Sequence, residues 1–343
     1  MAGTFQAFEI HGKENGKLVQ KELTEPARDE VRVKVKYVGI CGSDIHYYFE
    51  GTNGSFAIQE PLIPGHEISG VIDSDSSGTF PQGTPVTIHP AQSGEFTAEL
   101  ASQPHLWKGV RYLGSAATTP HTQGGLAEYL ILKREMIRPL PEGVSLKAGA
   151  LAEPLSVALH GISLAGELSG KKILVSGSGP IGLLTILALR TLKPAQITAI
   201  DIVDEALVRA QQLGADECIN VQRETLSKDS WDVVFECSGS ARAVNNAIAA
   251  VRRGGVIIQV GMLGLGLHEI DFGSIVTKEI RVHGAFRFNN EMSDALSLLE
   301  QNPEIERCIS HEFPIESWEE AFRVAKDSKA SGKVVIALNV KER

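Results

Sequence analysis

The chain has 343 residues, of which 43% are hydrophobic and 22% charged, and this ordinary globular composition excludes a disordered chain, a collagen and a coiled coil. The net charge of −9 is the opposite of the positive charge that nucleic-acid-binding proteins typically carry. The longest apolar stretch, 181–189, is too short to span a membrane. The first residues show no signal peptide, and the four cysteines are too far apart to suggest a disulfide framework. We therefore expect a cytoplasmic protein that binds neither nucleic acid nor membranes.

The first 150 residues are predicted to be rich in strands. Valine alternates with charged residues over 31–40, which is the period of a strand. Short β-branched runs at 68–73 and 84–88 indicate two further strands, and the turn residues of 73–83 predict a loop between them.

From residue 151 onward, strand and helix patterns alternate. Strands are expected at 171–177, 197–202, 231–239, 256–261 and 279–286, and helices at 180–192, 204–215 and 241–255. Such alternation predicts a parallel sheet with helices on both faces. A helix at 291–301 and a strand at 332–338 follow, and they do not suggest a third domain.

A GxGxxG motif follows one predicted strand and opens a predicted helix, which is the context expected of a dinucleotide site. Gly177 permits the tight turn, Gly179 lets the backbone approach a pyrophosphate, and Gly182 allows close helix–strand packing. Pro180 suits the first helical position, and Ile181 completes the motif. The alternative is a glycine turn that binds nothing.

Asp201 ends the next predicted strand, nineteen residues after Gly182. A carboxylate at that place accepts hydrogen bonds from the ribose hydroxyls of NAD and repels the 2′-phosphate of NADP. No Arg or Lys follows before Arg209, so the sequence favours NAD.

Four residues are candidate metal ligands, namely Cys41, His66, Glu67 and Glu153. A mixed set of sulfur, nitrogen and oxygen donors suits zinc, and a catalytic zinc keeps one position open for water or substrate. Only folding can bring these residues together, and each alone is also compatible with a core or turn position.

The segments CGSDIH, PGHE, AEPL, the glycine motif and GAFRF occur in this order across nearly the whole chain. Together they resemble the zinc-dependent medium-chain alcohol dehydrogenases, in the sorbitol and L-idonate dehydrogenase branch. The resemblance implies an α/β protein with a GroES-like β-barrel catalytic domain, 1–150 and 289–343. A doubly wound Rossmann domain, 151–288, is inserted into it.

The same resemblance implies roles for the candidate ligands. Cys41 and His66 bind one catalytic zinc, and Glu67 is a further ligand in the polyol branch. Glu153 either binds the metal or hydrogen-bonds its water, and Asp44 orients the zinc-bound histidine. Most relatives carry a second zinc held by four cysteines, but residues 89–114 contain no cysteine, so we expect no structural zinc.

Zinc and NAD together predict alcohol oxidation. Ser43 and His46 match the relay that carries the alcohol proton outward.

Substrate choice is expected to involve Arg287, whose guanidinium can hold several hydroxyls or one carboxylate. The alternative for Arg287 is a surface position. Tyr47 and Phe288 are candidate pocket walls or core residues, and His121 lines the pocket or caps a loop.

We therefore expect an NAD-linked zinc dehydrogenase of a sugar acid, with L-idonate first and a polyol such as sorbitol or xylitol second. It is expected to form a homo-oligomer, either a dimer or a tetramer. L-Threonine dehydrogenase, a zinc-free quinone reductase and a catalytically retired NAD-binding protein are less favoured. The quinone reductase would lack Cys41, His66 and Glu153, and this chain has all three.

Overall fold

The computed structural model describes residues 3–339, and the chain divides into two compact units. Unit 1 comprises Met1–Glu153, Ala295–Lys326 and Lys333–Arg343, and unit 2 comprises Pro154–Asp294 and Asp327–Gly332. Unit 2 is therefore inserted into the sequence of unit 1. The short segment Asp327–Gly332, near the end of the chain, also belongs to unit 2.

Unit 1 is built mainly from strands, and its largest sheet has seven of them in the order β11-β7-β6-β3-β19-β18, with β10 also paired to β3. The strands are β3 (Glu30–Gly39), β6 (Glu67–Ser74), β7 (Pro85–Ile88), β10 (Tyr129–Lys133), β11 (Ile137–Pro139), β18 (Ile309–Pro314) and β19 (Lys333–Ala337). The predicted alternation holds in β3, where Val31, Val33 and Val35 are fully buried and the residues between them are partly exposed. These valines belong to the main core of unit 1.

Smaller elements complete this part of the chain. They are β1 (Thr4–Ile10), β2 (Gly16–Glu22), α1 (Gly42–Glu50), β4 (Thr52–Asn53), β5 (Phe56–Ala57), β8 (Ala91–Gln92), β9 (Arg111–Tyr112), α2 (Leu146–Gly149), α8 (Met292–Gln301) and α9 (Trp318–Lys326), with short 3-10 turns at Ala98–Leu100, Pro104–Leu106, Arg134–Met136, Pro303–Cys308 and Ile315–Ser317. Phe8 of β1 packs on Trp318 and Phe322 of α9, with ring centroids 4.4 and 5.4 Å apart. The late helix α9 is thereby fixed to the first strand of the chain.

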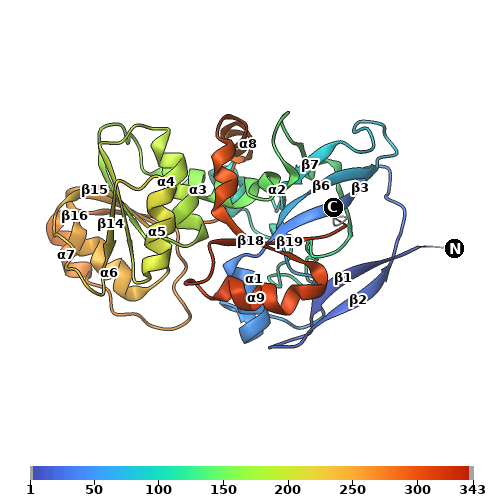
Figure 1. Cartoon of the computed structure of the whole chain (residues 1–343), viewed down its shortest axis with the longest axis horizontal. Coiled ribbons are helices and arrows are strands. Elements are labelled where there is room, and N and C mark those ends of the chain that lie inside the picture. Colours follow the sequence, from blue (N-terminus) through green and yellow to red (C-terminus); the bar gives the residue numbers. More distant parts are fainter. Residues whose placement is uncertain (1–2, 340–343) are drawn as a thin grey trace. The chain divides into compact units, whose positions relative to one another are not determined.

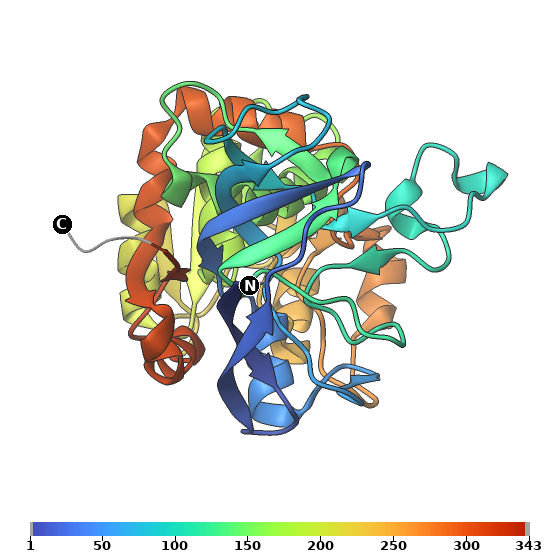
Figure 2. The ribbon, with the colours of Figure 1, turned by 90° about the vertical axis from the view of Figure 1, so that its right-hand side faces the viewer.

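Residues 89–114, the segment in which no structural zinc is expected, form a lobe that stands out from the rest of unit 1 (turquoise in Figure 2). The rings of Phe96 and Trp107 meet edge to face at 5.2 Å, and the Trp107 indole N–H donates to the carbonyl of Leu100 at 2.8 Å. An aromatic pair and a hydrogen bond thus connect segments within the lobe.

Unit 2 is a six-stranded parallel sheet in the order β14-β13-β12-β15-β16-β17. Its elements are α3 (Ala152–Leu164), β12 (Lys172–Ser176), α4 (Pro180–Arg190), β13 (Gln196–Asp201), α5 (Asp204–Gln212), β14 (Glu217–Asn220), β15 (Trp231–Glu236), α6 (Ala241–Ala250), β16 (Val251–Gln259), α7 (Phe272–Lys278) and β17 (Arg281–Gly284). In Figure 1, α4 and α5 lie against one half of the sheet, and α6 and α7 lie against the other. The strand order changes direction between β12 and β15, which is the point where doubly wound sheets bind their ligands.

The largest boundary difference from the sequence prediction lies where α6 ends and β16 begins. The helix expected over 241–255 ends at Ala250, and Val251 already belongs to β16 and pairs with Trp231. Pairing then resumes at Val256, so residues 252–255 form a bulge, in which Gly254 has a φ of +64°. Val251 is fully buried in the core of unit 2, and strand pairing with Trp231 places it there.

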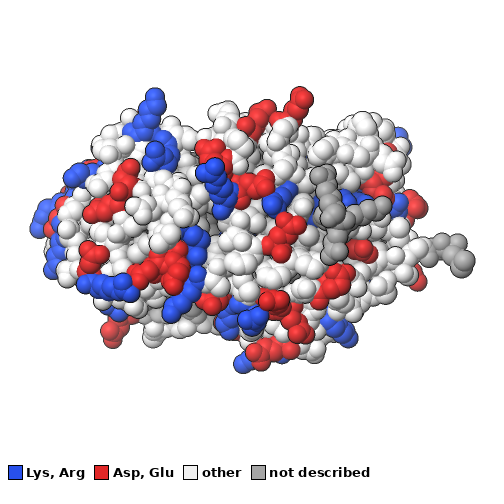
Figure 3. Space-filling view, viewed as in Figure 1, with Lys and Arg blue, Asp and Glu red and all other residues white. Residues whose placement is uncertain are grey.

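The surface carries charges of both signs. On the face in Figure 3, acidic and basic side chains are interspersed, with no broad field of one sign. Within residues 3–339 no helix is both long and apolar enough to cross a membrane.

Candidate metal centre and dinucleotide site

Three of the predicted metal ligands converge in unit 1. Cys41 follows β3 and stands before α1, whereas His66 and Glu67 stand at the start of β6. Because β3 and β6 are paired, with Gly39 opposite Glu67, the two segments meet at one end of the sheet. One donor atom from each of the three residues lies within 4.8 Å of the others, and this mixed sulfur, nitrogen and oxygen set suits zinc.

The buried side chain of Asp44 fixes both donor segments. Its Oδ2 accepts from the Cys41 backbone N–H at 2.9 Å, and its Oδ1 accepts from the Gly65 backbone N–H at 3.0 Å. The expected role of Asp44 in orienting the histidine thus has a specific form in the structure, in which Asp44 acts through the backbone on either side of the site. Its two oxygens hold backbone groups beside Cys41 and His66, and the Nδ1 of His66 has no hydrogen-bond partner among residues 3–339.

His66 supports the fit of a metal. It is buried, and an unpaired ring nitrogen in such a place is costly unless a ligand uses it. Burial alone lowers the pKa of His66, but the negative charges of Cys41, Asp44 and Glu153 raise it to about 10. The surroundings of the His66 ring therefore favour a positive charge. A divalent metal bound to the neutral ring would supply that charge in place of the ring proton.

A buried lysine holds Glu67. The Lys333 ammonium donates to Glu67 Oε1 at 2.6 Å and Oε2 at 2.7 Å, and to the carbonyl of Ile40 at 3.0 Å. Burial lowers the pKa of Lys333, but the charges of Glu67, Cys41 and Glu153 and the hydrogen bond to Glu67 together outweigh burial and raise the pKa. Each carboxylate oxygen has a second lone pair, so Glu67 can bind a metal without releasing Lys333. A Cβ on Gly39 would lie 1.9 Å from Glu67 Oε2, so only glycine fits beside this ion pair.

Glu153 is not a member of the donor cluster. Its Oε1 accepts a hydrogen bond from the Tyr112 hydroxyl at 2.5 Å, and burial raises the pKa of Glu153. The Tyr112 ring also meets the His66 ring edge to face at 5.5 Å. Of the two roles expected for Glu153, this arrangement favours the one without a bond to the metal. Tyr112 and Lys333 were not identified from the sequence.

Helix α1 carries Ser43 and His46, the two residues expected to relay the alcohol proton. Ser43 is partly exposed and His46 is exposed, and their spacing of three places them on one face of the helix. His46 Nδ1 lies 3.0 Å from Glu50 Oε1, one turn further on. Tyr47, by contrast, belongs to the core, and its hydroxyl accepts from the Ala116 backbone N–H at 3.0 Å. This placement favours a core role over a pocket wall.

His121 is held by its own loop region. Its Nε2 accepts from the Gln59 backbone N–H at 3.0 Å, and its Nδ1 lies 2.8 Å from the carbonyl of Thr118. Both ring nitrogens are occupied, so the geometry favours the loop-capping alternative over the substrate-binding one.

The glycine motif of unit 2 has the geometry that a dinucleotide requires. Gly177 has a φ of +93°, and a Cβ on Gly182 would lie 1.9 Å from the Gly177 carbonyl oxygen. A Cβ on Gly179 would meet nothing within 4 Å, so open space adjoins the start of α4, where Pro180 takes the first position and Ile181 follows. Free backbone N–H groups at such a helix start suit a pyrophosphate.

Asp201 lies beside this turn, at the end of β13. Asp201 and Gly177 both line a cavity of about 110 Å³ at the ends of the strands. Asp201 Oδ2 accepts from the Ser178 backbone N–H at 2.7 Å, and Oδ1 accepts from those of Ile202 and Val203 at 2.7 and 3.0 Å. The carboxylate is therefore firmly oriented at the place expected for the ribose.

Arg287 and Phe288 belong to unit 2, whereas all the metal donors belong to unit 1. Arg287 has a φ of +55°, which is uncommon for a residue with a side chain, and its guanidinium lies 4.7 Å from the centroid of the Phe286 ring. Phe288 is buried.

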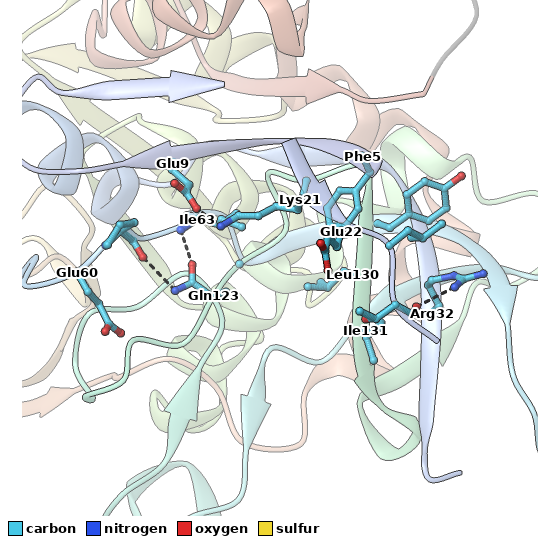
Figure 4. Close-up of a pocket in the computed structure, with 16 residues that line it drawn as sticks. Phe5, Glu9, Lys21, Glu22, Arg32, Glu60, Ile63, Gln123, Leu130 and Ile131 are labelled. Atoms are coloured by element: carbon cyan, nitrogen blue, oxygen red, sulfur yellow. Dashed lines mark hydrogen bonds and ion pairs between the residues drawn. The ribbon is translucent and has the colours of Figure 1, made fainter. Parts of the chain in front are cut away.

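A separate cavity of about 550 Å³ in unit 1 lies beside the β1–β2 hairpin (Figure 4). Several of its polar groups have partners within the protein. Gln123 accepts from the Ile63 backbone N–H and donates to the carbonyl of Pro61, and Glu9 pairs with Lys21. Neither a cysteine nor a histidine lines this cavity.

Comparison with known proteins identifies both domains of the chain. Residues 27–142 match the alcohol dehydrogenase GroES-like domain, and residues 180–301 match the zinc-binding dehydrogenase domain. The L-idonate 5-dehydrogenase (NAD(P)(+)) of Escherichia coli K12 is 38% identical over 312 residues, covering 88% of this chain and 90% of that protein. The sorbitol dehydrogenase of Bos taurus is 32% identical over 334 residues, covering 92% of each.

The chain belongs to the zinc-dependent medium-chain alcohol dehydrogenases. The crystal structure of L-idonate 5-dehydrogenase from Escherichia coli superposes with a TM-score of 0.92 at 33% identity, covering 98% of this chain and 99% of that one. The expected α/β fold, with a GroES-like domain and a Rossmann sheet, is thereby confirmed. As a member of the sorbitol and idonate branch, the protein is a zinc- and NAD-dependent dehydrogenase of polyols or sugar acids.

Proposed function

We propose that the protein oxidises a secondary hydroxyl of a sugar acid, with L-idonate, oxidised at C5, as the first candidate. The observation that carries the chemistry is the buried cluster of Cys41, His66 and Glu67, with one His66 nitrogen unpaired. The greater identity to L-idonate 5-dehydrogenase than to sorbitol dehydrogenase supports the acid.

We assign the roles in this reaction as follows. When bound, zinc polarises the substrate oxygen and NAD accepts the hydride. Cys41, His66 and Glu67 would hold the metal, and Glu153, positioned by Tyr112, would orient water or substrate beside it. Ser43 takes the hydroxyl proton, and the exposed His46 releases it to solvent.

Arg287 is the residue to which we assign the carboxylate. The left-handed backbone at Arg287 is consistent with a functional constraint, because strain of this kind concentrates at binding sites. A hydrogen bond between charged groups is worth about 1.5–3 kcal/mol. We therefore expect Arg287→Leu to lower kcat/KM on L-idonate roughly 10- to 150-fold and to lower it less on sorbitol, whose hydroxyls are neutral.

The test is NADH formation from L-idonate, D-gluconate, sorbitol, xylitol and L-threonine, with the native protein, Arg287→Leu and Arg287→Lys. The lysine variant keeps the charge and should retain part of the preference for the acid. The KM for L-idonate should also rise with ionic strength more than the KM for sorbitol. If Arg287→Leu lowers kcat/KM by the same factor on L-idonate and on sorbitol, Arg287 does not bind the carboxylate.

A polyol such as sorbitol or xylitol is the second candidate, and the sorbitol dehydrogenase relatives favour it. Higher kcat/KM on sorbitol or xylitol than on any acid would make this the function. Absence of turnover on the whole panel by protein with bound zinc would instead indicate a retired enzyme.

We also infer a reducing, cytoplasmic setting, because all four cysteines are free thiols. A homo-oligomer is proposed as well. All four residues of the edge strand β17 are exposed, and open strand edges of this kind invite pairing with another chain. Light scattering on the purified protein would distinguish a monomer, which would contradict this inference, from a dimer or tetramer.

A further inference from the structure

The loop that carries Arg287 is held at both of its ends within unit 2. It runs over residues 285–291, between the end of β17 and the start of α8. At its first residue, the Ala285 N–H donates to the carbonyl of Gln259 at 2.9 Å, which continues the pairing of β17 with β16. At its last residue stands Glu291. The position of Arg287 therefore depends on these two attachments.

Glu291 has a partner for each of its carboxylate oxygens. Its Oε1 accepts a hydrogen bond from His160 Nδ1 at 2.9 Å, and its Oε2 accepts one from the Asn289 backbone N–H at 2.6 Å. His160 belongs to α3, so the carboxylate connects that helix with the backbone two residues after Arg287. Only 9% of the His160 side chain and 14% of the Glu291 side chain are exposed, so water competes little for these hydrogen bonds.

The backbone at Arg287 needs such a support. Its φ of +55° lies in the left-handed region, which a residue with a side chain keeps only where the surrounding structure enforces it. A largely buried charged pair adds little net stability, because desolvation offsets its attraction. The pair of His160 and Glu291 is better explained by the geometry that it imposes. With Phe288 buried and the Asn289 N–H held, the backbone that follows Arg287 is fixed.

We propose that Glu291, held by His160, is a positioning residue that keeps Arg287 in its left-handed conformation and thereby supports its contact with the substrate. Glu291 acts through the backbone of the loop and not on the substrate itself. This inference rests on the proposed function, in which Arg287 binds the substrate, and it adds the part of the protein that places Arg287.

The first experiment measures hydrogen exchange in the zinc-loaded, full-length protein without substrate, by mass spectrometry of peptides from residues 285–291 and from β12. In Glu291→Leu the loop should exchange about 10-fold faster, because the Asn289 N–H loses its acceptor, while β12 should exchange at the native rate. Glu291→Gln keeps an oxygen for the Asn289 N–H and should retain most of the protection. Unchanged exchange of the loop in Glu291→Leu would overturn the proposal, whatever the substrate is.

The second experiment is a double-mutant cycle of Glu291→Leu and Arg287→Leu, with kcat/KM measured on L-idonate and on sorbitol. Glu291→Leu alone should lower kcat/KM on L-idonate about 10-fold, which corresponds to about 1.4 kcal/mol, mainly through a higher KM, and should lower it less on sorbitol. In the Arg287→Leu background, Glu291→Leu should have no further effect, because the group that it positions is gone. A merely structural role would give additive losses, so additivity would overturn the proposal.

Asp232→Leu is the matched control. Asp232 is also a carboxylate of unit 2 that joins a side chain to a backbone N–H, since it accepts from Arg252 Nε at 2.7 Å and from the Lys172 N–H at 2.9 Å. It lies in β15, outside the loop, so its loss should leave the ratio of kcat/KM on L-idonate to that on sorbitol unchanged. His160→Phe keeps a ring and removes the donor, and it should change this ratio in the same direction as Glu291→Leu.

The two experiments separate this inference from the function on which it rests. If Arg287→Leu lowers kcat/KM equally on both substrates, the carboxylate contact fails, but faster loop exchange and a non-additive cycle still support Glu291 as the residue that positions Arg287. If Arg287→Leu changes kcat/KM on neither substrate, Glu291 cannot act through Arg287 and the proposal is overturned.

Discussion

The ion pair between Lys333 and Glu67 gives the sharpest prediction about stability. Both side chains are almost wholly buried, at 2% and 1% exposure, and three hydrogen bonds from the ammonium are used inside the protein. Lys333→Met leaves the Glu67 carboxylate buried with its main positive partner removed. Removing one member of a buried ion pair costs about 3–5 kcal/mol, so the metal-free variant should lose that much of its free energy of unfolding.

The assay is urea denaturation of the metal-free protein, followed by tryptophan fluorescence, for each member of a double-mutant cycle. Glu67→Gln alone should also destabilise, since Lys333 then loses its anionic partner. The combined variant should be more stable than Lys333→Met alone, because no buried charge remains unpaired.

A second buried lysine provides the control. Lys278 pairs with Asp229, whose side chain is 53% exposed, and donates to two backbone carbonyls. Lys278→Met should therefore cost less, about 1–2 kcal/mol, because Asp229 remains hydrated. If the combined variant at 67 and 333 is no more stable than Lys333→Met, the buried pair is not the source of the effect.

Three further outcomes are expected. Cys41→Ser should reduce zinc from one per chain to near none and abolish turnover while NAD+ still binds, as elemental analysis and titration would show; two zincs per native chain would contradict the site. Asp201→Ser should narrow the ratio of affinities for NAD+ and NADP+, and an unchanged ratio by calorimetry would remove Asp201 from cofactor choice. Burial raises the pKa of Glu291, but hydrogen bonds from His160 and the Asn289 N–H lower it below its usual value. The stability that Glu291 contributes is therefore present above about pH 4.5 and lost as the pH falls, so the urea midpoints of the native protein and Glu291→Gln should converge in acid; a constant difference would refute this.

The sheet of unit 2 was predictable because its signals are local. Each buried strand is a short apolar run, and the turn between Gly177 and Gly182 marks the first strand–helix connection by residue type alone. The helix end at Ala250 was not predictable in this way. Helical propensity continues past that residue, and only pairing with Trp231 makes Val251 a strand residue.

The same distinction between local and long-range signals applies to the candidate site. Cys41, His66 and Glu67 could be proposed from residue type and resemblance. The partners that control them lie far away in sequence, as Lys333 does from Glu67 and Tyr112 from Glu153. In the sequence, Lys333 stands at the start of a short apolar strand and is indistinguishable from an ordinary surface lysine. No sequence spacing connects it to Glu67, which lies 266 residues earlier. Such pairs follow from strand register and packing, which a single sequence does not specify.

The position of β19 has a consequence for synthesis. This strand pairs with the end of β3 at Gly39, Val38 and Tyr37, and it delivers Lys333 to Glu67. The ribosome makes β3 early and β19 only after nearly all of unit 2. During translation the growing chain therefore exposes an open strand edge and an acidic group without its counter-charge, while unit 2 can already fold. Nascent unit 1 should consequently be the part of the protein that depends most on chaperones.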